Sequence, residues 1–303
     1  MSIRLALLVL IGATSALFIV LWVRSLARGA ASDTSASVRP TWTEIAIGAV
    51  SNFFDTLGIG SFATTTAAYK ALRLVPDEHI PGTLLIGHAL PVATQAFIFI
   101  AGVHVDTTVL LTLIAACVAG GWLGAGVATR LPRRPIQIGM GSGLLLAATL
   151  MVLTQVGALP GGGTAQSLAG GPLVFAAVMS ALFGALLMIG IGNYAPTLIL
   201  LSLLGMDPRA AFPIMMGAAA LVNMAGGLRF ISRARYHPRA ALGLTLGGIP
   251  AVLLAGLVVK TLPLEVLRWV VVAVVTYAAV MMLRSAFVTQ PSPAEGVAEA
   301  SVA

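Results

Sequence analysis

Two apolar segments of this chain are each interrupted by a short run of glycines and polar residues. The first interruption reads Phe54-Asp55-Thr56-Leu57-Gly58-Ile59-Gly60-Ser61-Phe62-Ala63-Thr64-Thr65-Thr66. The second lies 132 residues later (Gly58 to Gly190) and reads Met188-Ile189-Gly190-Ile191-Gly192-Asn193-Tyr194-Ala195-Pro196-Thr197. A helix broken in lipid exposes backbone polar groups that find no water, so the break must be buried in protein or line a wet cavity. Two breaks at matching places therefore predict a binding site between the two repeats of a transporter.

The composition is that of an integral membrane protein. Of the 303 residues, 58% are hydrophobic and 9% are charged, whereas about 25% of the residues in a soluble domain are charged. The net charge is +7, but the basic residues cluster at the ends of apolar runs, as the positive-inside rule requires. We therefore expect no nucleic-acid partner. Cys117 is the single cysteine and the four histidines are scattered, so we expect no disulfide within the chain, no metal site and no cofactor.

These features predict an all-α polytopic membrane protein with two inverted-topology repeats and an extra N-terminal transmembrane helix. The first apolar run, residues 3–23, is long enough to span a bilayer. Because Arg24 and Arg28 follow it, we expect an uncleaved anchor rather than a signal peptide. We divide the chain into an anchor helix with its linker (1–41), a first repeat (42–155), a glycine-rich linker (156–171), a second repeat (172–284) and a disordered cytoplasmic tail (285–303).

Each repeat is predicted to contain one broken segment followed by three transmembrane helices. The broken segments cover residues 42–75 and 172–204, and the helices cover residues 80–101, 107–129, 135–155, 211–230, 240–259 and 264–283. Identical residues recur at an offset of 131 or 132, and these pairs are Gly58/Gly190, Ile59/Ile191, Gly60/Gly192, Ala63/Ala195, Thr65/Thr197, Pro81/Pro213 and Pro132/Pro263. An internal duplication explains these matches better than a chance alignment of apolar residues.

The arginines predict that the two repeats have opposite orientations in the membrane. In the first repeat, the loop at residues 102–106 has no Lys or Arg, and the next loop carries Arg130, Arg133 and Arg134. In the second repeat the pattern is reversed, and the first of these loops carries Arg229, Arg233, Arg235 and Arg239. If the arginine-rich loops face the cytoplasm, one repeat is inverted relative to the other. The charges therefore favour re-entrant hairpins for both broken segments, and fully spanning segments are the alternative.

The residues around the two breaks are the candidate substrate site. A re-entrant hairpin places the start of its second half-helix near the bilayer midplane, where unpaired N–H groups attract an anion. Glycines let the backbone approach a ligand, and hydroxyl residues cap helices and donate hydrogen bonds. The candidates are Gly58, Gly60, Ser61, Thr64, Thr65, Gly190, Gly192, Asn193, Tyr194 and Thr197. The alternative is that the glycines only allow helices to pack closely.

Two ionisable residues within the apolar segments are candidates for proton coupling. Asp55 lies one turn before Gly58, and a carboxylate inside a membrane is a functional hypothesis by default. His88 lies beside Pro91 in another apolar helix and could relay protons. For each residue there is a structural alternative, a capped helix end for Asp55 and a hydrogen bond between helices for His88. The repeat mate of Asp55 is Leu187, so its role differs between the two halves.

Two segments broken at Gly-x-Gly, each followed by three spans with a Leu-Pro turn before the last, resemble the sulfite exporter TauE/SafE family. The resemblance covers residues 42–283, and the matching residues are Leu57-Gly58-Ile59-Gly60-Ser61 with Pro81-Gly82-Thr83, and Ile189-Gly190-Ile191-Gly192-Asn193 with Pro213. This chain has Ser61-Phe62 and Asn193-Tyr194 where further glycines are common in the family. The resemblance implies transport of sulfite, an organosulfonate or a similar small organic anion.

We therefore expect a secondary transporter that moves a small oxyanion by alternating access, with proton coupling as a further hypothesis. The expected location is the plasma (inner) membrane, with several crossings and lipid as the surroundings. An intramembrane lipid-modifying enzyme and an anion channel are the alternatives. The enzyme is disfavoured because such sites gather Glu, Arg, Ser and His, and neither break has an arginine near it. The sequence leaves open the anion, the direction of transport, the coupling ion and the oligomeric state.

Overall fold

The structure is a computed structural model of the chain and describes residues 3–27, 39–58, 60–128, 133–158, 163–188, 192–261 and 263–288. Gly190 and residues 289–303 of the expected tail lie outside these described residues, as do residues 28–38 and 159–162 of the two linkers, whereas residues 285–288 belong to the last helix. The elements are α1 (Ile3–Ala27), α2 (Trp42–Thr56), α3 (Ser61–Ala71), the short helix η1 (Asp77–His79), α4 (Ile80–Gly87), α5 (Ala89–Gly102), α6 (Thr107–Ala128), α7 (Arg133–Gln155), α8 (Gly170–Leu187), α9 (Tyr194–Leu203), α10 (Pro208–Ser232), α11 (Pro238–Thr261) and α12 (Leu264–Val288).

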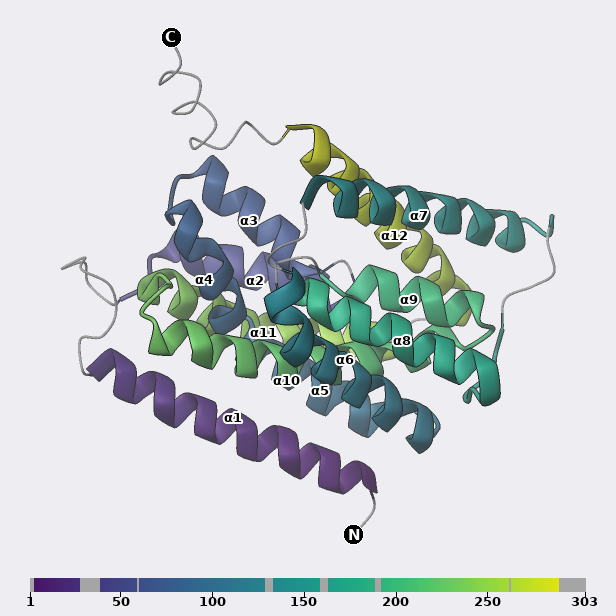
Figure 1. Cartoon of the computed structure of the whole chain (residues 1–303), viewed down its shortest axis with the longest axis horizontal. Helices are drawn as coiled ribbons and strands as arrows, with labels where there is room; N and C mark the ends of the chain where they lie inside the picture. Colours follow the sequence, from purple (N-terminus) through teal and green to yellow (C-terminus); the bar gives the residue numbers. More distant parts are fainter. Residues whose placement is uncertain are drawn as a thin grey trace.

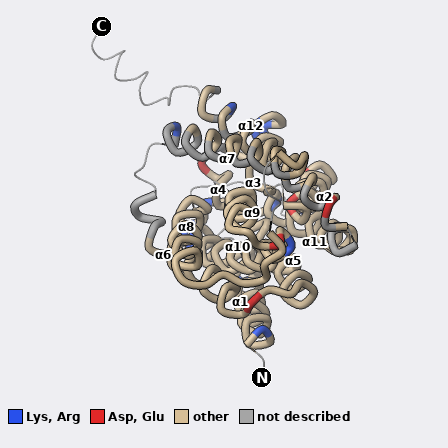
Figure 2. The backbone as a smooth tube through the Cα atoms, turned by 90° about the vertical axis from the view of Figure 1, so that its right-hand side faces the viewer, with Lys and Arg blue, Asp and Glu red and all other residues tan. Residues whose placement is uncertain are grey.

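The architecture is that of an α-helical membrane protein. Within the described residues, five helical stretches are long and apolar enough to cross a membrane, and these are Ile3–Ala27, Ile80–Gly102, Gly170–Leu187, Pro208–Ser232 and Pro238–Val258. Figure 2 shows how few residues along the described tube are charged. The expected fold class, all-α with apolar helices of membrane-spanning length, is confirmed.

The helices pack in pairs that join distant parts of the chain (Figure 1). α2 lies along α11, α6 lies along α8, and α7 lies along α12. α10 is central, because it contacts α4, α5, α6 and α9 and also α1. In each of these three pairs, a helix from the first half of the chain packs against a helix from the second half.

Glycines allow the closest of these pairs to form. A Cβ atom at Gly247 of α11 would lie 2.0 Å from the Ile45 carbonyl oxygen of α2. In the other pair, a Cβ atom at Gly120 of α6 would lie 1.9 Å from the Ala181 carbonyl oxygen of α8. Small residues at such contacts let backbones approach and gain van der Waals contact, which is a main source of helix association in membranes.

A capping box and an ion pair fix the start of α2. The Thr41 hydroxyl accepts a 3.3 Å hydrogen bond from the Glu44 amide, and Glu44 Oε2 accepts a 2.7 Å bond from the Thr41 amide. Such reciprocal bonds satisfy two N–H groups at a helix start. The second carboxylate oxygen of Glu44 lies 2.9 Å from Arg239 Nε at the start of α11. The pair therefore holds the first turns of α2 and α11 together.

Both broken segments are hairpins that return to the end of the bundle from which they start. In the first hairpin, α2 starts at the Glu44–Arg239 pair, and α3 ends near Tyr69, whose hydroxyl donates to the Ala240 carbonyl at 3.3 Å. In the second hairpin, α8 starts five residues after Ala165, and α9 ends beside Ala165, whose amide donates to the Gly205 carbonyl at 3.2 Å. The hairpins are α2–α3 and α8–α9.

These two hairpins start at opposite ends of the bundle. α10 has 25 residues and is therefore about 37 Å long. Its first turn follows Asp207, next to the second hairpin, and its last turn leads to Arg239, next to the first hairpin. We call these the Asp207 end and the Arg239 end. The two hairpins therefore meet tip to tip inside the bundle.

The basic residues gather at the Arg239 end. Those in the last turns of helices or in the loops at this end are Arg24, Lys70, Arg73, Arg229, Arg233, Arg235 and Arg239. α1 contributes Arg24 here because it runs parallel to α10, with Phe18 beside Gly227. At the Asp207 end, Arg4 and Arg209 share the surface with Asp106 and Asp207.

Candidate functional site

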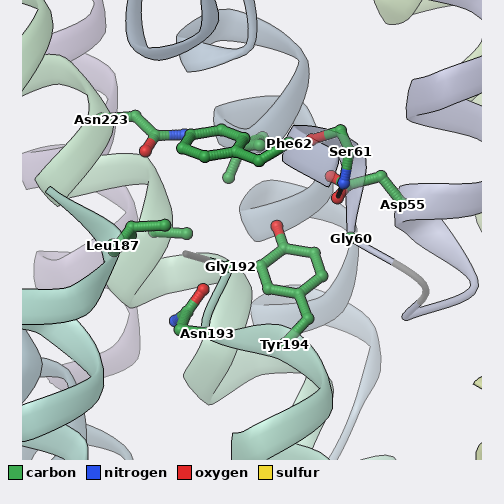
Figure 3. Close-up of a pocket in the computed structure, with 11 residues that line it drawn as sticks. Asp55, Gly60, Ser61, Phe62, Leu187, Gly192, Asn193, Tyr194 and Asn223 are labelled. Carbon is green, nitrogen blue, oxygen red and sulfur yellow. Dashed lines mark hydrogen bonds between the residues drawn. The ribbon is translucent and has the colours of Figure 1, made fainter. Parts of the chain in front are cut away.

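A small cavity lies where the tips of the two hairpins meet (Figure 3). Its volume for the centres of water-sized molecules is about 20 Å³, enough for about one ordered water. α2–α3, α5, α8–α9 and α10 all contribute to its walls. The lining residues are Asp55, Gly60, Ser61, Phe62, Val92, Leu187, Gly192, Asn193, Tyr194, Ala219 and Asn223.

The first hairpin turns at two glycines, and its own aspartate caps the second helix. Gly58 has φ +97° and Gly60 has φ +83°, a left-handed backbone that residues with a Cβ rarely adopt. Gly60 is the N-cap of α3 and has no side chain to offer. Instead, Asp55 Oδ1 accepts a 2.6 Å hydrogen bond from the Ser61 amide. The expected capping role of Ser61 is therefore filled by Asp55, which is 2% exposed.

A hydrogen-bonded chain links Asp55 to the second hairpin. Gln95 of α5 donates through Nε2 to Asp55 Oδ2 at 2.9 Å and to the Thr56 hydroxyl at 3.0 Å. The side-chain oxygen of Gln95, Oε1, accepts a 2.8 Å bond from the Tyr194 hydroxyl. Both carboxylate oxygens of Asp55 are thus satisfied, one by backbone and one by side chain. In Figure 3 the Tyr194 hydroxyl points toward Asp55 and Ser61.

The second hairpin and α10 each present one buried polar atom that has no partner among the described residues. Asn193 is the N-cap of α9 but makes no side-chain cap bond, and its Oδ1 atom is buried without a hydrogen-bond partner. The same holds for Oδ1 of Asn223 on α10. The two residues are 2% and 1% exposed. A buried polar group without a partner is costly, so both amides favour a polar molecule in the cavity.

The backbone at this tip is open as well. A Cβ atom built at Gly192 would meet nothing within 4 Å. Leu187 stands where the first hairpin has Asp55, and it lines the cavity with an apolar side chain. Among the described residues, no carboxylate therefore accompanies the start of α9. The described residues of the two tips therefore differ in charge, since Asp55 lies in the first and Leu187 takes its place in the second.

His88 lies beside the cavity and joins three helices. The α4–α5 helix breaks at His88 because Pro91 has no N–H to donate to the Gly87 carbonyl. That carbonyl accepts a 2.9 Å bond from the Thr245 hydroxyl of α11 instead. His88 Nδ1 lies 3.0 Å from Asn52 Oδ1, and Nε2 lies 3.2 Å from the Thr65 hydroxyl.

These contacts define the tautomer of His88. Asn52 Nδ2 donates to the Gly48 carbonyl at 2.8 Å, so Asn52 Oδ1 faces the ring as an acceptor. His88 Nδ1 must then carry the proton, and the Thr65 hydroxyl donates to Nε2 of the neutral ring. In this arrangement His88 holds α2 to α3. Its proposed part in proton coupling stays a prediction.

The structure brings together some of the candidate residues and separates others from the cavity. The candidates that line it are Asp55, Gly60, Ser61, Gly192, Asn193 and Tyr194. Gly58, Thr64, Thr65, Thr197 and His88 are outside the lining, and Gly190 lies outside the described residues. The Thr64 hydroxyl donates to the Ser61 carbonyl at 2.9 Å.

Sequence reasoning interprets Gln95 and Asn223 as contacts between helices and does not place them at the site. Their signal is a lone polar residue inside an apolar helix, which more often marks helix packing. Phe62, Val92, Leu187 and Ala219 carry no signal of this kind, since apolar residues line every helix contact in such a chain. Their place at the cavity follows only from the three-dimensional arrangement.

The described residues contain no group of three or more His, Cys, Asp or Glu side chains that could hold a metal ion. Comparison of the chain with models of protein families, with curated proteins and with solved structures found no match. The chemistry of the site must therefore be argued from its own residues. Those residues can hold a small polar molecule between one tip that carries a carboxylate and one tip that does not.

Proposed function

We propose that this protein is a secondary transporter that moves a small oxyanion by alternating access. The observation that carries the proposal is that two hairpins from opposite ends of the bundle meet at a polar cavity. Inverted repeats with broken helices at the midplane are a recurring plan of secondary transporters. The reciprocal pairing of α2 with α11 and of α8 with α6 supports such a repeat, since one symmetry operation exchanges these two pairs.

An anion is the substrate that the second tip favours. The start of α9 offers backbone N–H groups and a positive helix-dipole end, with Tyr194 and the Asn193 amide beside it. An asparagine side chain can present its NH₂ group to an oxyanion by rotating its amide. The resemblance to the TauE/SafE family adds sulfite and small organosulfonates as the substrates to test. Membership of that family is part of the proposal.

The cavity corresponds to a closed state in this proposal. A four- or five-atom oxyanion needs more room than one water, so the two tips must separate when it binds. A wider hollow of about 320 Å³ lies at the Asp207 end, with His104, Gln166 and Arg209 in its wall. The Phe99 and Phe212 rings also line it and stack with centroids 5.1 Å apart.

Phe212 connects this hollow to the first hairpin. A Cβ atom built at Gly58 would lie 4.0 Å from Cζ of the Phe212 ring. The stacked pair Phe99–Phe212 therefore stands between the hollow and the turn of the first hairpin. We propose that the pair is the gate on this side.

The charges give the proposed orientation. The Arg239 end, rich in arginine, faces the cytoplasm by the positive-inside rule, and the Asp207 end with the hollow faces outward. The proposed location is the plasma (inner) membrane.

The test is flux of labelled sulfite and methanesulfonate into proteoliposomes, with sulfate beside them. We expect saturable flux of at least one of the three, and we expect it to fall at least tenfold in Asn193→Leu and in Asn223→Leu. Gly171→Ala is the matched control, because a Cβ atom at Gly171 meets nothing within 4 Å. No flux of any of these anions by well-folded wild-type protein would overturn the proposal.

A further inference from the structure

We propose that the Asp55 carboxylate is a built-in substitute for the substrate anion. It occupies the start of α3 while the site is empty, and it releases that position when it takes up a proton, so that one proton travels with each monoanion. The proposal rests on the proposed function. It adds the stoichiometry and the residue that sets it.

The first step is that the anion site of the first hairpin is already filled. A helix start binds anions through its free N–H groups and its dipole. In α3 the first of these groups, the Ser61 amide, donates to Asp55 Oδ1 at 2.6 Å. Asp55 lies six residues earlier in the same hairpin and comes back to the site across the Gly58–Gly60 turn. The carboxylate thus makes the contact that a bound oxyanion would make.

The second step is that no described side chain fills the equivalent site of the second hairpin. Leu187 takes the place of Asp55, and the Asn193 side chain, which points toward the cavity in Figure 3, has its Oδ1 without a partner. The backbone at Gly192 faces open space. The start of α9 can therefore take an anion once the two tips separate, with the Asn193 amide rotated so that its NH₂ group faces the anion.

The third step is that the two sites share one hydrogen-bond chain. The Tyr194 hydroxyl donates to Gln95, and Gln95 donates to Asp55 Oδ2. The hydroxyl can donate only one hydrogen bond. If it donates this bond to a bound anion, Gln95 loses it. Binding at the start of α9 therefore disturbs the groups that hold Asp55 as a carboxylate.

The fourth step is charge. Among the described residues, the cavity lining contains no Lys, Arg or His that could offset two anions. The titratable groups that face Asp55 from neighbouring elements are Tyr194 of α9 directly and His88 at the α4–α5 break, which reaches α2 through Asn52 and α3 through Thr65. A second anion is accommodated when a proton from water binds a carboxylate oxygen of Asp55. The site then holds one negative charge both empty and loaded.

Protonation also changes the hydrogen bonds in the required sense. A protonated Asp55 is a weaker acceptor for the Ser61 amide and carries a hydroxyl that can itself donate. The Ser61 amide becomes available to an oxygen of the substrate, so both helix starts bind one anion together. On the other side of the membrane the anion leaves, the proton returns to water and the Ser61 amide binds the carboxylate again.

The test uses the full-length protein in proteoliposomes and methanesulfonate as the probe, because this ion stays a monoanion across the working pH range. We expect one proton to enter with each methanesulfonate, measured with a pH dye inside the vesicles, and no net current on a supported membrane. We expect binding of labelled methanesulfonate to weaken about tenfold per pH unit on the alkaline side of the Asp55 titration.

Asp55→Asn cannot ionise, so its methanesulfonate affinity should not change with pH. It should exchange labelled for unlabelled methanesulfonate while moving no protons. Asp106→Asn is the matched control, because Asp106 caps α6 at the far end of the bundle through a 3.0 Å bond to the Val109 amide. Asparagine also caps helices, so this variant should behave as wild type.

The outcomes separate the role of Asp55 from transport itself. If wild-type protein moves methanesulfonate saturably but moves no protons, the proposed role of Asp55 is overturned and the transport proposal stands. Proton movement by Asp55→Asn would overturn that role as well. If Asp55→Asn does not fold, the proton count and the current of the wild-type protein decide the matter alone. If the wild-type protein moves none of the tested anions, the proposed function itself fails.

Discussion

The Tyr194 hydroxyl donates a 2.8 Å hydrogen bond to the Gln95 side chain, and through this bond the second hairpin contacts the network that holds the first. The two residues are 99 positions apart in the chain. Gln95 belongs to neither hairpin, since it lies on α5. Its side chain therefore forms hydrogen bonds to both hairpins from a third element.

Replacing Tyr194 by phenylalanine should remove the hydrogen bond that connects the second hairpin to the Gln95–Asp55 network. The side-chain oxygen Oε1 of Gln95 would lose its hydrogen-bond donor inside the bundle. Leaving a buried acceptor unsatisfied lowers the free energy of unfolding by about 2 kcal/mol. We expect a lower melting temperature together with weaker anion binding. Melting can be followed with a thiol-reactive fluorogenic dye, because Cys117 is the only cysteine and is 3% exposed.

Tyr277→Phe is the control for this experiment, since Tyr277 is 38% exposed on α12. It should melt at the wild-type temperature. Equal melting temperatures for Tyr194→Phe and wild type would show that the bond between the tips contributes nothing to stability.

Trimming Phe212 should open the proposed gate at the Asp207 end. Phe212→Leu removes the ring that stacks on Phe99 at 5.1 Å and retains an apolar side chain. In a Cys117→Ala background, a cysteine placed by Ser61→Cys should react several-fold faster with a membrane-impermeant thiol reagent added from this side. Phe54→Leu, at a residue 43% exposed, is the control. An unchanged rate would place the route to the cavity elsewhere.

Adding a methyl group between α2 and α11 should destabilise the whole bundle. In Gly247→Ala the new Cβ atom would lie 2.0 Å from the Ile45 carbonyl oxygen, which is backbone and cannot rotate away. Forced expansion of a packed contact costs about 1–3 kcal/mol. The dye assay should show a lower melting temperature than for Gly171→Ala, where the same methyl group meets open space. Equal values would mean that the helices separate at little cost.

Stability should also fall in mild acid because of His237, which lies outside the membrane-spanning segments. Its Nδ1 accepts a 3.3 Å hydrogen bond from the Ala240 amide at the start of α11, so the ring must be neutral there. Burial lowers the pKa of His237 below its ordinary value of 6.5, although Glu44 opposes this. A lowered pKa in the folded state means that its contribution is present above pH 6.5 and is lost as the pH falls through the folded value.

The measurement is the melting temperature of the wild-type protein and of His237→Asn between pH 8 and pH 5. Asparagine can cap the helix but does not titrate, so the difference between the two proteins should grow in favour of the variant as the pH falls. Parallel pH profiles would remove His237 as the cause.

The hairpins could be predicted from the sequence because two glycines and several hydroxyl residues interrupt apolar runs that otherwise continue. An interrupted apolar segment can adopt few structures in lipid, and a matching second copy limits the possible structures further. The inverted orientation of the two repeats, argued from the arginines around Arg133 and Arg233, stays a prediction. The glycines, hydroxyl residues and arginines that give these predictions lie within short segments, so they can be read from the sequence alone.

The partners of each side chain could not be predicted in the same way. Asp55 was expected to carry a proton or to cap a helix, but its bond to the Ser61 amide depends on how tightly the Gly58–Gly60 turn closes. Gln95 gained its place because α5 passes both tips, a contact between segments far apart in the chain. Thr64 and Thr65 look alike in sequence, yet only Thr65 faces His88. The helix rotation that decides this comes from packing.

The ion pair between Glu44 and Arg239 joins residues 195 positions apart, and this separation has a consequence for how the chain is made. Ribosomes deliver α2 to the membrane long before α11 exists. Until then the face of α2 around Gly48 and the carboxylate of Glu44 have no matching surface. Synthesis must therefore reach the last third of the chain before the Glu44 carboxylate can meet its partner Arg239.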